Sequence, residues 1–286
     1  GFKQIEIYRI PTTPLPFFNI ERSADVTDPT PVSGGVFGSI SISTNGVRIL
    51  DDVNPGAGRV FRVFDTNIGS ATFGQLIGSI SSPLATGVFG DRTILSGNIL
   101  LISNVATNGN IIYHAFNIDR DSPGFLNLLL TIEDPTPDGY FGNDFQFFSP
   151  YKKLYIINKN LAGNEVYNIF DINPANATFG QLLGSIELPA QNGGTFSIMA
   201  VYDTSAVYSP GVLYFKGVDS LGITRIYLYD VNPSSATFED LILTISDPDP
   251  VSPTKFGTSY TFYNNYLVLN DENSFSDTFY HVFDIN

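Results

Sequence analysis

The sequence predicts an all-β protein built from one repeated unit. An aromatic residue at the end of an apolar stretch recurs at intervals of roughly 52 to 59 residues, and a Phe-Gly pair precedes it at a similar spacing. No stretch shows a helical period of apolar residues. A fixed period of this size over the whole chain is typical of a β-propeller. The recurring aromatics are Phe64, Phe116, Phe170, Tyr229 and Phe283, with a weaker match at Tyr8, and the Phe-Gly pairs begin at Phe37, Phe89, Phe141 and Phe256, with Phe196 in the same place of the fourth unit.

The first two strands of the unit are predicted to form a hairpin. Residues 36–43 alternate between apolar and small or polar side chains, which is the pattern of a strand with two different faces. A Thr-Asn-Gly turn at residues 44–46 follows, and residues 47–50 form a short apolar second strand. The second strand is clearer in the later units, at residues 99–102, 154–157, 212–215 and 266–269.

The third and fourth strands follow from turn residues and further apolar runs. A turn rich in Gly and Asn, such as residues 54–58, leads into a third strand over residues 59–64. The third strand is apolar on both faces, as expected for a sheet packed between two others. An Asp-x-Asn-Pro turn ends it, residues 71–80 are predicted to form the fourth strand, and Pro-rich links such as residues 134–137 lead to the next unit.

Together these units predict a single β-propeller domain over residues 1–286, with five blades of four antiparallel strands each. A β-solenoid is the alternative, but its coils are usually shorter and need no hairpin turns. The repeats are expected at approximately residues 32–83, 84–136, 137–190, 191–250 and 251–286, preceded by N-terminal strands in residues 1–31.

The two ends of the chain are expected to complete each other. The last unit stops after its third strand, so residues 16–20 are predicted to supply the fourth strand of that blade. The remaining N-terminal segment forms either an extra edge strand or a strand donated to a neighbouring molecule, because an open edge needs a partner. The residues expected on this assembly strand are Phe2, Ile5, Ile7, Tyr8 and Ile10.

The Phe-Gly strand, followed by a strand that ends in an aromatic residue and Asp, resembles the Phe-Gly repeats of integrin-type propellers. The resemblance covers nearly the whole chain but depends on short motifs. It implies a calcium loop of the type Asp-x-Asp-x-Asp-Gly between the first strands of a blade. No intact copy is present, and residues 119–124 (DRDSPG) follow a third strand instead. We therefore expect no metal ion and no cofactor.

Composition excludes several classes of function. The 286 residues carry 28 acidic and 14 basic side chains, a net charge of −14, which repels nucleic acids and anionic membranes. The chain has no cysteine, so it forms no disulfide and has no thiolate nucleophile. No apolar run approaches the roughly 20 residues of a membrane span. Because the chain starts at Gly1, we expect a processed N-terminus and a secreted or cell-surface protein.

The acidic and histidine residues are predicted to be structural. The repeated Asp of the Asp-x-Asn-Pro turns recurs in nearly every unit, as a turn-capping role requires. Three acidic pairs are interpreted as solvated loop charges rather than metal or acid–base sites, and the two histidines as structural residues without a nucleophile nearby. The turn residues are Asp65, Asp171, Asp230 and Asp284, the pairs are Asp51 with Asp52, Asp247 with Asp249 and Asp271 with Glu272, and the histidines are His114 and His281.

Carbohydrate recognition is the alternative function, because exposed tyrosine rings stack on sugars. A glycoside hydrolase is a weaker alternative; it needs two carboxylates at a defined distance, roughly 5 to 9.5 Å apart. The candidate sugar contacts are Tyr140, Tyr151, Tyr202 and Tyr260, and the candidate glycosidase carboxylates are Asp91, Asp144 and Asp203. Asn176 begins a glycosylation sequon in a predicted surface turn.

The leading expectation is a non-enzymatic, extracellular structural or adhesive protein that acts by protein–protein assembly. No unit departs from the repeat in a way that marks a catalytic centre, and we expect no catalytic residues. The expected partner is a second copy or another surface protein, with a glycan as the alternative ligand. A heterologous contact through the N-terminal strand would build a filament.

Overall fold

The computed structural model describes residues 4–9, 21–44, 46–56, 58–107, 109–135, 141–142, 145–148, 152–159, 164–188, 195–202, 211–218, 223–248, 256–263, 266–272 and 277–284. Within these ranges the chain forms strands and turns and no helix, as the sequence predicts. It divides into two compact units, residues 1–139 and residues 140–286. The single domain over residues 1–286 stays a prediction.

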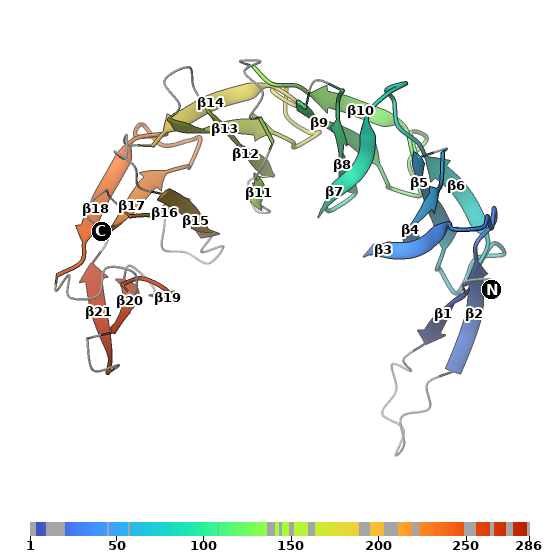
Figure 1. The fold of residues 1–286 in the computed structure, drawn as a ribbon, viewed down its shortest axis with the longest axis horizontal. Helices are drawn as coiled ribbons and strands as arrows, with labels where there is room; N and C mark the ends of the chain where they lie inside the picture. The colour runs from blue at the N-terminus through green and yellow to red at the C-terminus, as the bar shows by residue number, and fades with distance from the viewer. Residues whose placement is uncertain are drawn as a thin grey trace. The chain divides into compact units, whose positions relative to one another are not determined.

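The first unit contains one two-stranded and two four-stranded antiparallel sheets (Figure 1). The strand order within each four-stranded sheet follows the chain, so each strand pairs with the one before it. The strands are β1 (Gln4–Arg9) and β2 (Glu21–Thr27), then β3 (Val36–Thr44), β4 (Val47–Asn54), β5 (Gly58–Asp65) and β6 (Leu76–Ile80), then β7 (Val88–Ser96), β8 (Ile99–Val105), β9 (Ile111–Asn117) and β10 (Leu128–Ile132).

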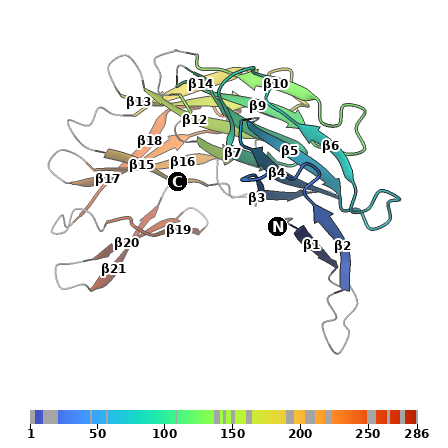
Figure 2. The same cartoon turned by 45° about the vertical axis from the view of Figure 1, so that its right-hand side comes forward.

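The second unit contains two four-stranded sheets and one three-stranded sheet, again antiparallel and in chain order (Figure 2). The strands are β11 (Phe145–Phe148), β12 (Lys153–Lys159), β13 (Glu165–Asp171) and β14 (Leu182–Glu187), then β15 (Thr195–Tyr202), β16 (Val212–Val218), β17 (Thr224–Asp230) and β18 (Leu241–Ser246), then β19 (Tyr260–Tyr263), β20 (Tyr266–Glu272) and β21 (Thr278–Asp284).

The predicted strands are confirmed, with one shift in the fourth. Residues 71–75, predicted as its first half, form a tight turn instead, and β6 begins at Leu76. Two backbone hydrogen bonds close this turn, from Gly74 N to Asp65 O and from Gln75 N to Thr72 O. The turn reverses the chain after β5, which leaves five residues for the fourth strand.

Within each unit, consecutive sheets pack face to face and share one core between them. In the first unit, Phe61 and Val63 of β5 pack with Leu100 and Phe116 of the following sheet. In the second unit, Tyr167 of β13 packs with Phe215 of β16, with ring centroids 4.7 Å apart. We call the face that meets the following sheet the forward face, and the opposite face the rear face. The two-faced apolar pattern of the third strand is thus explained by packing.

Packing explains both residues of the Phe-Gly pair. Phe89 is buried on the rear face of its sheet, in edge-to-face contact with Phe116. The glycine after it, Gly90, has a φ of 81°, where a residue with a Cβ is strained. A Cβ on Gly90 would also lie 2.6 Å from the ring of Phe61 in the preceding sheet. The same φ region recurs at Gly38, Gly142 and Gly257.

A side chain from the turn of one sheet also fills the space over a glycine in the fourth strand of the sheet before it. Leu126 takes the left-handed position of its turn, with a φ of 64°. The corresponding turns before β6 and β14 have glycine there, Gly74 and Gly180. Its side chain lies over Gly78 of the preceding sheet, where a Cβ would approach it to 2.2 Å. Glu239 covers Gly184 in the same way. Each glycine in a fourth strand therefore makes room for a side chain of the next sheet.

The N-terminal pair β1–β2 has the register of a third and a fourth strand. Ile5 lies opposite Val26 and Ile7 opposite Ala24, with a bulge before Tyr8. The pair β5–β6 repeats this arrangement, with Phe61 opposite Ile80, Val63 opposite Gly78 and a bulge before Phe64. Among the described residues, β2 (residues 21–27) therefore takes the place of a fourth strand, and the prediction for residues 16–20 falls outside the described residues.

Candidate assembly surface

The last sheet has an open edge along β21. The other sheets with a complete third strand carry a fourth strand beside it, whereas β21 pairs with β20 and with no other strand of the described residues. A strand without a second partner presents unpaired backbone N–H and C=O groups. This agrees with the sequence prediction that the last unit lacks its own fourth strand.

The forward face of the last sheet is exposed as well. Tyr280 and Val282 of β21 are 68% and 63% exposed, and Tyr266 of β20 is 44% exposed. In the sheet before it, the residues at the same register positions are Ile226, Leu228 and Val212, at 0%, 1% and 5%. In the first unit the corresponding residues of β5 and β4 (Phe61, Val63 and Val47) are all 0% exposed. We call Tyr266, Tyr280, Val282 and the open edge of β21 the assembly surface.

The rear face of the last sheet is packed against the preceding sheet, whereas its forward face is exposed. Phe256, Leu267 and Leu269 belong to the core shared with the preceding sheet. The His281 ring stands edge-on to Phe256, and its Nε2 lies 3.4 Å from Asp271 Oδ2. The landmark Phe283 packs against the same core. The exposure of Tyr280 and Val282 therefore does not come from a frayed strand.

At the other end of the repeat, a two-stranded sheet stands where the later sheets have four strands. Val26 of β2 is 1% exposed and packs on Phe37, Leu50 and Phe64, the rear face of β3–β6. Among the residues whose side chains are described, this core cluster has four buried members, whereas the clusters between the later sheets have eight or ten. The described chain thus has a third and a fourth strand at its start and a sheet without a fourth strand at its end.

Three of the four repeated Asp residues, Asp65, Asp171 and Asp230, hold the turns after the third strand, as predicted, whereas the turn after Asp284 lies outside the described residues. Asp65 is buried and accepts hydrogen bonds from Asn67 N at 2.8 Å and from Thr72 Oγ1 at 2.5 Å. Arg120 of the next turn donates to Asp65 at 2.8 Å. Asp171 and Asp230 repeat the contacts to backbone and threonine. These carboxylates are occupied by turn contacts, which leaves no ring of free carboxylates among them.

These contacts set the acidity of Asp65. Burial raises the pKa of its carboxyl, but hydrogen bonds from Ser70, Thr72 and the backbone of Asn67 outweigh that effect. The charge of Arg120 acts in the same direction, so the pKa of Asp65 lies below its ordinary value. A depressed pKa is what a carboxylate stabilised in its charged form shows, and it supports a structural role.

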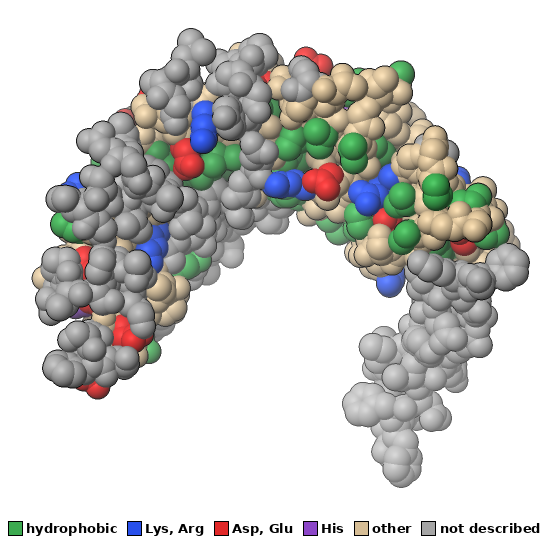
Figure 3. Space-filling model, viewed as in Figure 1, with side chains coloured by type: hydrophobic (Ala, Val, Ile, Leu, Met, Phe, Trp, Pro, Cys, Tyr) green, Lys and Arg blue, Asp and Glu red, His purple; other side chains and the backbone are tan. Residues whose placement is uncertain are grey.

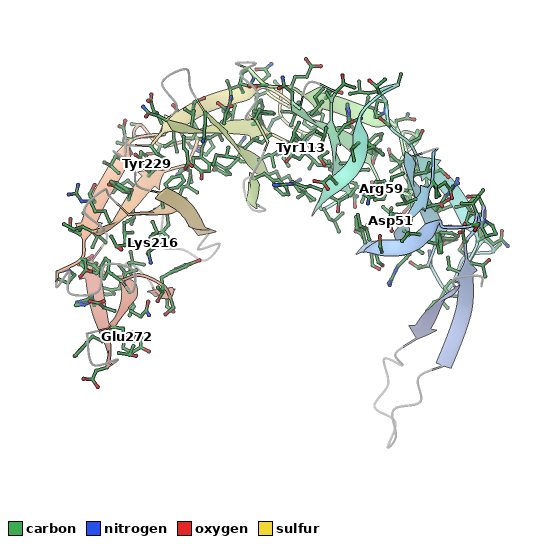
Figure 4. All side chains as sticks on the ribbon, viewed as in Figure 1. Asp51, Arg59, Tyr113, Lys216, Tyr229 and Glu272 are labelled. Atoms are coloured by element: carbon green, nitrogen blue, oxygen red, sulfur yellow. The ribbon has the colours of Figure 1, made fainter. Side chains whose placement is uncertain are left out.

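The interpretation of the acidic pairs as solvated loop charges is wrong for four residues. Asp51 and Asp52 lie on β4 and are buried, as are Asp247 and Asp271. Asp51 accepts hydrogen bonds from Ser39 Oγ and Ile40 N, and Asp52 forms an ion pair with Arg62 at 2.8 Å. Figure 4 shows Asp51 and Arg59 on neighbouring strands, and their side chains approach to 3.5 Å. Asp51 therefore holds the bulge of β3, and Asp52 holds a residue of the third strand. Both carboxylates are buried because their partners lie on the neighbouring strands of the same sheet.

The two histidines keep the structural role predicted for them. His114 is 1% exposed, and its Nδ1 lies 3.0 Å from Thr131 Oγ1 on β10. Burial lowers the pKa of His114, which favours the neutral ring. Within the described residues, no group of His, Asp and Glu is arranged to hold a metal ion.

The candidate sugar contacts are only partly described. Tyr260 is half-buried, with its ring centroid 5.0 Å from that of Tyr214. Burial, with the neighbouring Tyr260, raises the pKa of Tyr214 far above its ordinary value. Tyr140 and Tyr151 lie outside the described residues, as does the side chain of Tyr202. Tyr260 therefore packs against Tyr214, and sugar binding by all four residues stays a prediction.

Three further candidates can be placed in part. Asp91 is exposed on β7, whereas Asp144 and Asp203 lie outside the described residues, so no carboxylate distance is defined. Asn176 is exposed, and its Nδ2 donates to Asp171 Oδ2 at 2.8 Å. Thr178 of the same sequon also donates to Asp171. The sequon thus serves the turn, and its glycosylation stays a prediction. Of the assembly strand, Ile5, Ile7 and Tyr8 lie on β1, while Phe2 and Ile10 are not described.

The first unit has a cleft of about 430 Å³ between the turn after β4 and the link that leads to β7. Polar groups beside it already have partners: Ser82 Oγ accepts from Asn104 at 2.6 Å, and Arg59 donates to Gly90 O. In the space-filling view, hydrophobic side chains also reach the surface over the β3–β6 sheet (Figure 3). The polar side chains among its described lining residues are Arg59, Ser81, Ser82 and Thr86, and this set does not point to a particular ligand.

No helix in the described ranges is long and apolar enough to cross a membrane.

No protein-family model and no curated protein matches the chain. Among solved structures, the chain is similar to the WD40 domain of coronin from Toxoplasma gondii, with a TM-score of 0.37, 13% identity, and coverage of 83% of this chain and 55% of that one. It is also similar to the WD40 domain of SCAP from fission yeast, with a TM-score of 0.43, 9% identity, and coverage of 93% and 69%. The chain spans about half the length of the coronin structure. Both are WD40 β-propeller domains, and the Phe-Gly, integrin-like type stays a prediction.

Proposed function

We propose that the protein is a non-enzymatic, extracellular structural or adhesive protein that acts through protein–protein assembly, as a filament subunit joined through residues 1–31. The observation that carries the proposal is the assembly surface. Tyr280 and Val282 are exposed where the equivalent residues of the other sheets are buried. Exposed apolar surface beside an open strand edge is typical of a site that binds another chain.

The two ends of the repeat differ, which favours a head-to-tail contact. In the described residues, one end has a third strand without a fourth strand beside it, and the other has an extra third and fourth strand. A contact between unlike surfaces leaves one of each free, so it propagates into a filament unless the rotation closes a ring. A second copy is therefore the partner that we favour over another surface protein.

The propeller architecture is part of the proposal. Five sheets in the described chain carry the repeated landmarks, and the N-terminal segment supplies strands of the type that the last sheet lacks. We propose five blades of the Phe-Gly, integrin-like kind, with residues 1–31 completing the last blade. The segment that completes it comes from the same chain or from a neighbouring copy.

Composition supports an extracellular, non-enzymatic role. Only 15% of residues are charged and the net charge is −14, which disfavours nucleic acids. The carboxylates of Asp65 and Asp171 are engaged in turns, and that of Asp52 forms an ion pair. Carbohydrate binding is the alternative, and the described tyrosine among its candidates packs against Tyr214.

Electron microscopy and sedimentation velocity of the full chain test the proposal. We expect oligomers or filaments that grow with protein concentration, and their loss in a chain that lacks residues 1–31. A circular dichroism spectrum should confirm that the shortened chain keeps its strands. A full chain that stays monomeric over the whole concentration range would overturn the proposal and direct attention to a glycan array.

A further inference from the structure

The proposed assembly leaves open which N-terminal strand completes the last sheet. The sequence analysis assigns residues 16–20 to that place and leaves the segment with Ile5, Ile7 and Tyr8, now β1, as the strand for donation to a neighbour. The register of the sheets favours β2 instead, because β1 occupies the place of a third strand. The last sheet already has its third strand, β21, and lacks the fourth.

The positions of β1 and β21 correspond one to one. Counting back from the landmark aromatic, Ile7 and Val282 share one position, and Ile5 and Tyr280 share another. Val26 and Ala24 of β2 lie opposite Ile5 and Ile7 in the structure. The same pairing on β21 would set Val26 opposite Tyr280 and Ala24 opposite Val282. The strand β2 can therefore pair with either partner in one register, bulge included.

We propose that β2 of one copy pairs with β21 of a second copy as the fourth strand of its last sheet, and that β1 holds the same place on β2 until then. This inference rests on the proposed function. It assigns the donated strand, its register and its acceptor. The partner is thus a second copy of this chain, and the contact is an exchange of one antiparallel ladder for an equivalent one.

The terms that change in the exchange favour β21. Backbone hydrogen bonds cancel to a first approximation, because one antiparallel pair replaces another of the same register. Charges on directly opposite residues favour neither pairing, since each has one like-charge pair. The strand β1 sets Glu6 opposite Asp25 and Arg9 opposite Glu21. The strand β21 would set His281 opposite Asp25 and Asp284 opposite Glu21.

Apolar burial favours β21, because β1 brings only Ile5 and Ile7 at these positions, whereas β21 also brings the exposed Tyr266 of β20. Val26 brings β2 onto Phe37, Leu50 and Phe64, and a sheet that takes β1's place enters the same packing. Tyr280 and Val282, now exposed, would then face that rear surface, as Ile226 and Leu228 face the next sheet. Removing exposed apolar area from water is the dominant favourable term in association.

Introduced cysteines test the pairing, because the chain has none of its own. Two single variants, Asp25→Cys and His281→Cys, would be distinguished by tags of different length, mixed and oxidised. Directly opposite residues of antiparallel strands have Cα atoms about 4.5–5.5 Å apart, within the range of a disulfide. The control pair is Ala24→Cys with His281→Cys, one residue out of register, which turns the two thiols to opposite faces.

We expect the mixed disulfide dimer from the register pair in at least about tenfold excess over the control pair, since a slip of one residue separates the thiols. Equal yields would overturn the proposal. It would also be overturned if the double variant Asp25→Cys/His281→Cys closed its disulfide within one chain while the mixture gave none.

Deletion of residues 1–10 provides a second readout without cysteines. If β1 competes with β21 for β2, its removal should strengthen self-association several-fold, because a larger fraction of chains then offers a free β2. Loss of association on this deletion would show that β1 itself is donated, and would overturn the proposal. A chain that self-associates without the register-specific dimer refutes this inference alone, whereas a chain that stays monomeric refutes the proposed function too.

Discussion

The sheets β15–β18 and β19–β21 share the order of their first three strands and an aromatic residue at the landmark position, but their forward faces differ in burial. Ile226 and Leu228 are buried beneath the following sheet, and Tyr280 and Val282 at the same positions are exposed. The residue types hardly differ, so burial is set by whether a neighbouring sheet is present. Apolar residues without a partner in this position indicate a surface that awaits one.

The largest expected effect contrasts the two faces directly. Ile226→Ala should lower the free energy of unfolding by about 2–5 kcal/mol, because it leaves a cavity in a core where Ile226 is 0% exposed. Tyr280→Ala at the equivalent position should change it by no more than about 0.5 kcal/mol. Urea unfolding measures both. Equal losses would mean that the last sheet is packed on its forward face after all.

A second contrast concerns the glycine after the landmark phenylalanine. Gly90→Ala should cost about 2–4 kcal/mol, because it adds a Cβ at a positive φ and brings it to 2.6 Å from the Phe61 ring. Gly109→Ala is the matched control, since its φ is 89° but no atom lies within 4 Å of the added Cβ. It should cost about 1 kcal/mol. Thermal unfolding of both variants would distinguish packing from backbone strain.

The alternation between neighbouring sheets predicts a compensating pair. Gly78→Ala should cost about 1–3 kcal/mol, because its Cβ would lie 2.2 Å from the side chain of Leu126. Leu126→Gly places glycine at a φ of 64° and removes that contact. In this background Gly78→Ala should cost only about 0.5 kcal/mol. A double-mutant cycle in urea gives the coupling, and additive losses would refute the contact.

The smallest effect that we expect is the pH dependence carried by Asp65. Its folded-state pKa is depressed, so the stabilisation is present above the unfolded value of about 3.9 and is lost as pH falls through the folded value. Asp65→Asn should therefore lower the urea midpoint at pH 7 and flatten its decline below about pH 4. Asn117 already takes this position in the turn after β9, which makes Asn a tolerated replacement. An unchanged acid limb would assign the pH dependence to other carboxylates.

Much of the fold could be predicted from the sequence, because each landmark has a local physical cause. Phe-Gly marks a bulge and a core ring, and Asp-x-Asn marks a capped turn. Burial of Asp51 and Asp52 could not be predicted, since their partners Arg59 and Arg62 follow only from strand register. The pairing of Gly78 with Leu126 had a visible signal: a glycine in one fourth strand (Gly78, Gly184) is followed one repeat later by a large side chain at the turn position (Leu126, Glu239).

The candidate surface was predicted only in part. The missing fourth strand of the last unit is evident in the sequence, whereas the exposure of Tyr280 and Val282 depends on the sheet that would face them. The role of β2 also depended on register, because the alternation of apolar residues around Val26 is weak and residues 16–20 are more apolar.

The most direct test is sedimentation velocity of the variant Tyr280→Ser/Val282→Ser beside the unmodified chain. The control is Ile68→Ser/Val88→Ser, which removes two apolar residues of similar exposure, 55% and 60%, from the first unit. We predict that the unmodified chain and the control form oligomers as concentration rises, and that Tyr280→Ser/Val282→Ser stays monomeric with an unchanged unfolding midpoint. Identical sedimentation of all three proteins would contradict the assignment of β19–β21 as the assembly surface.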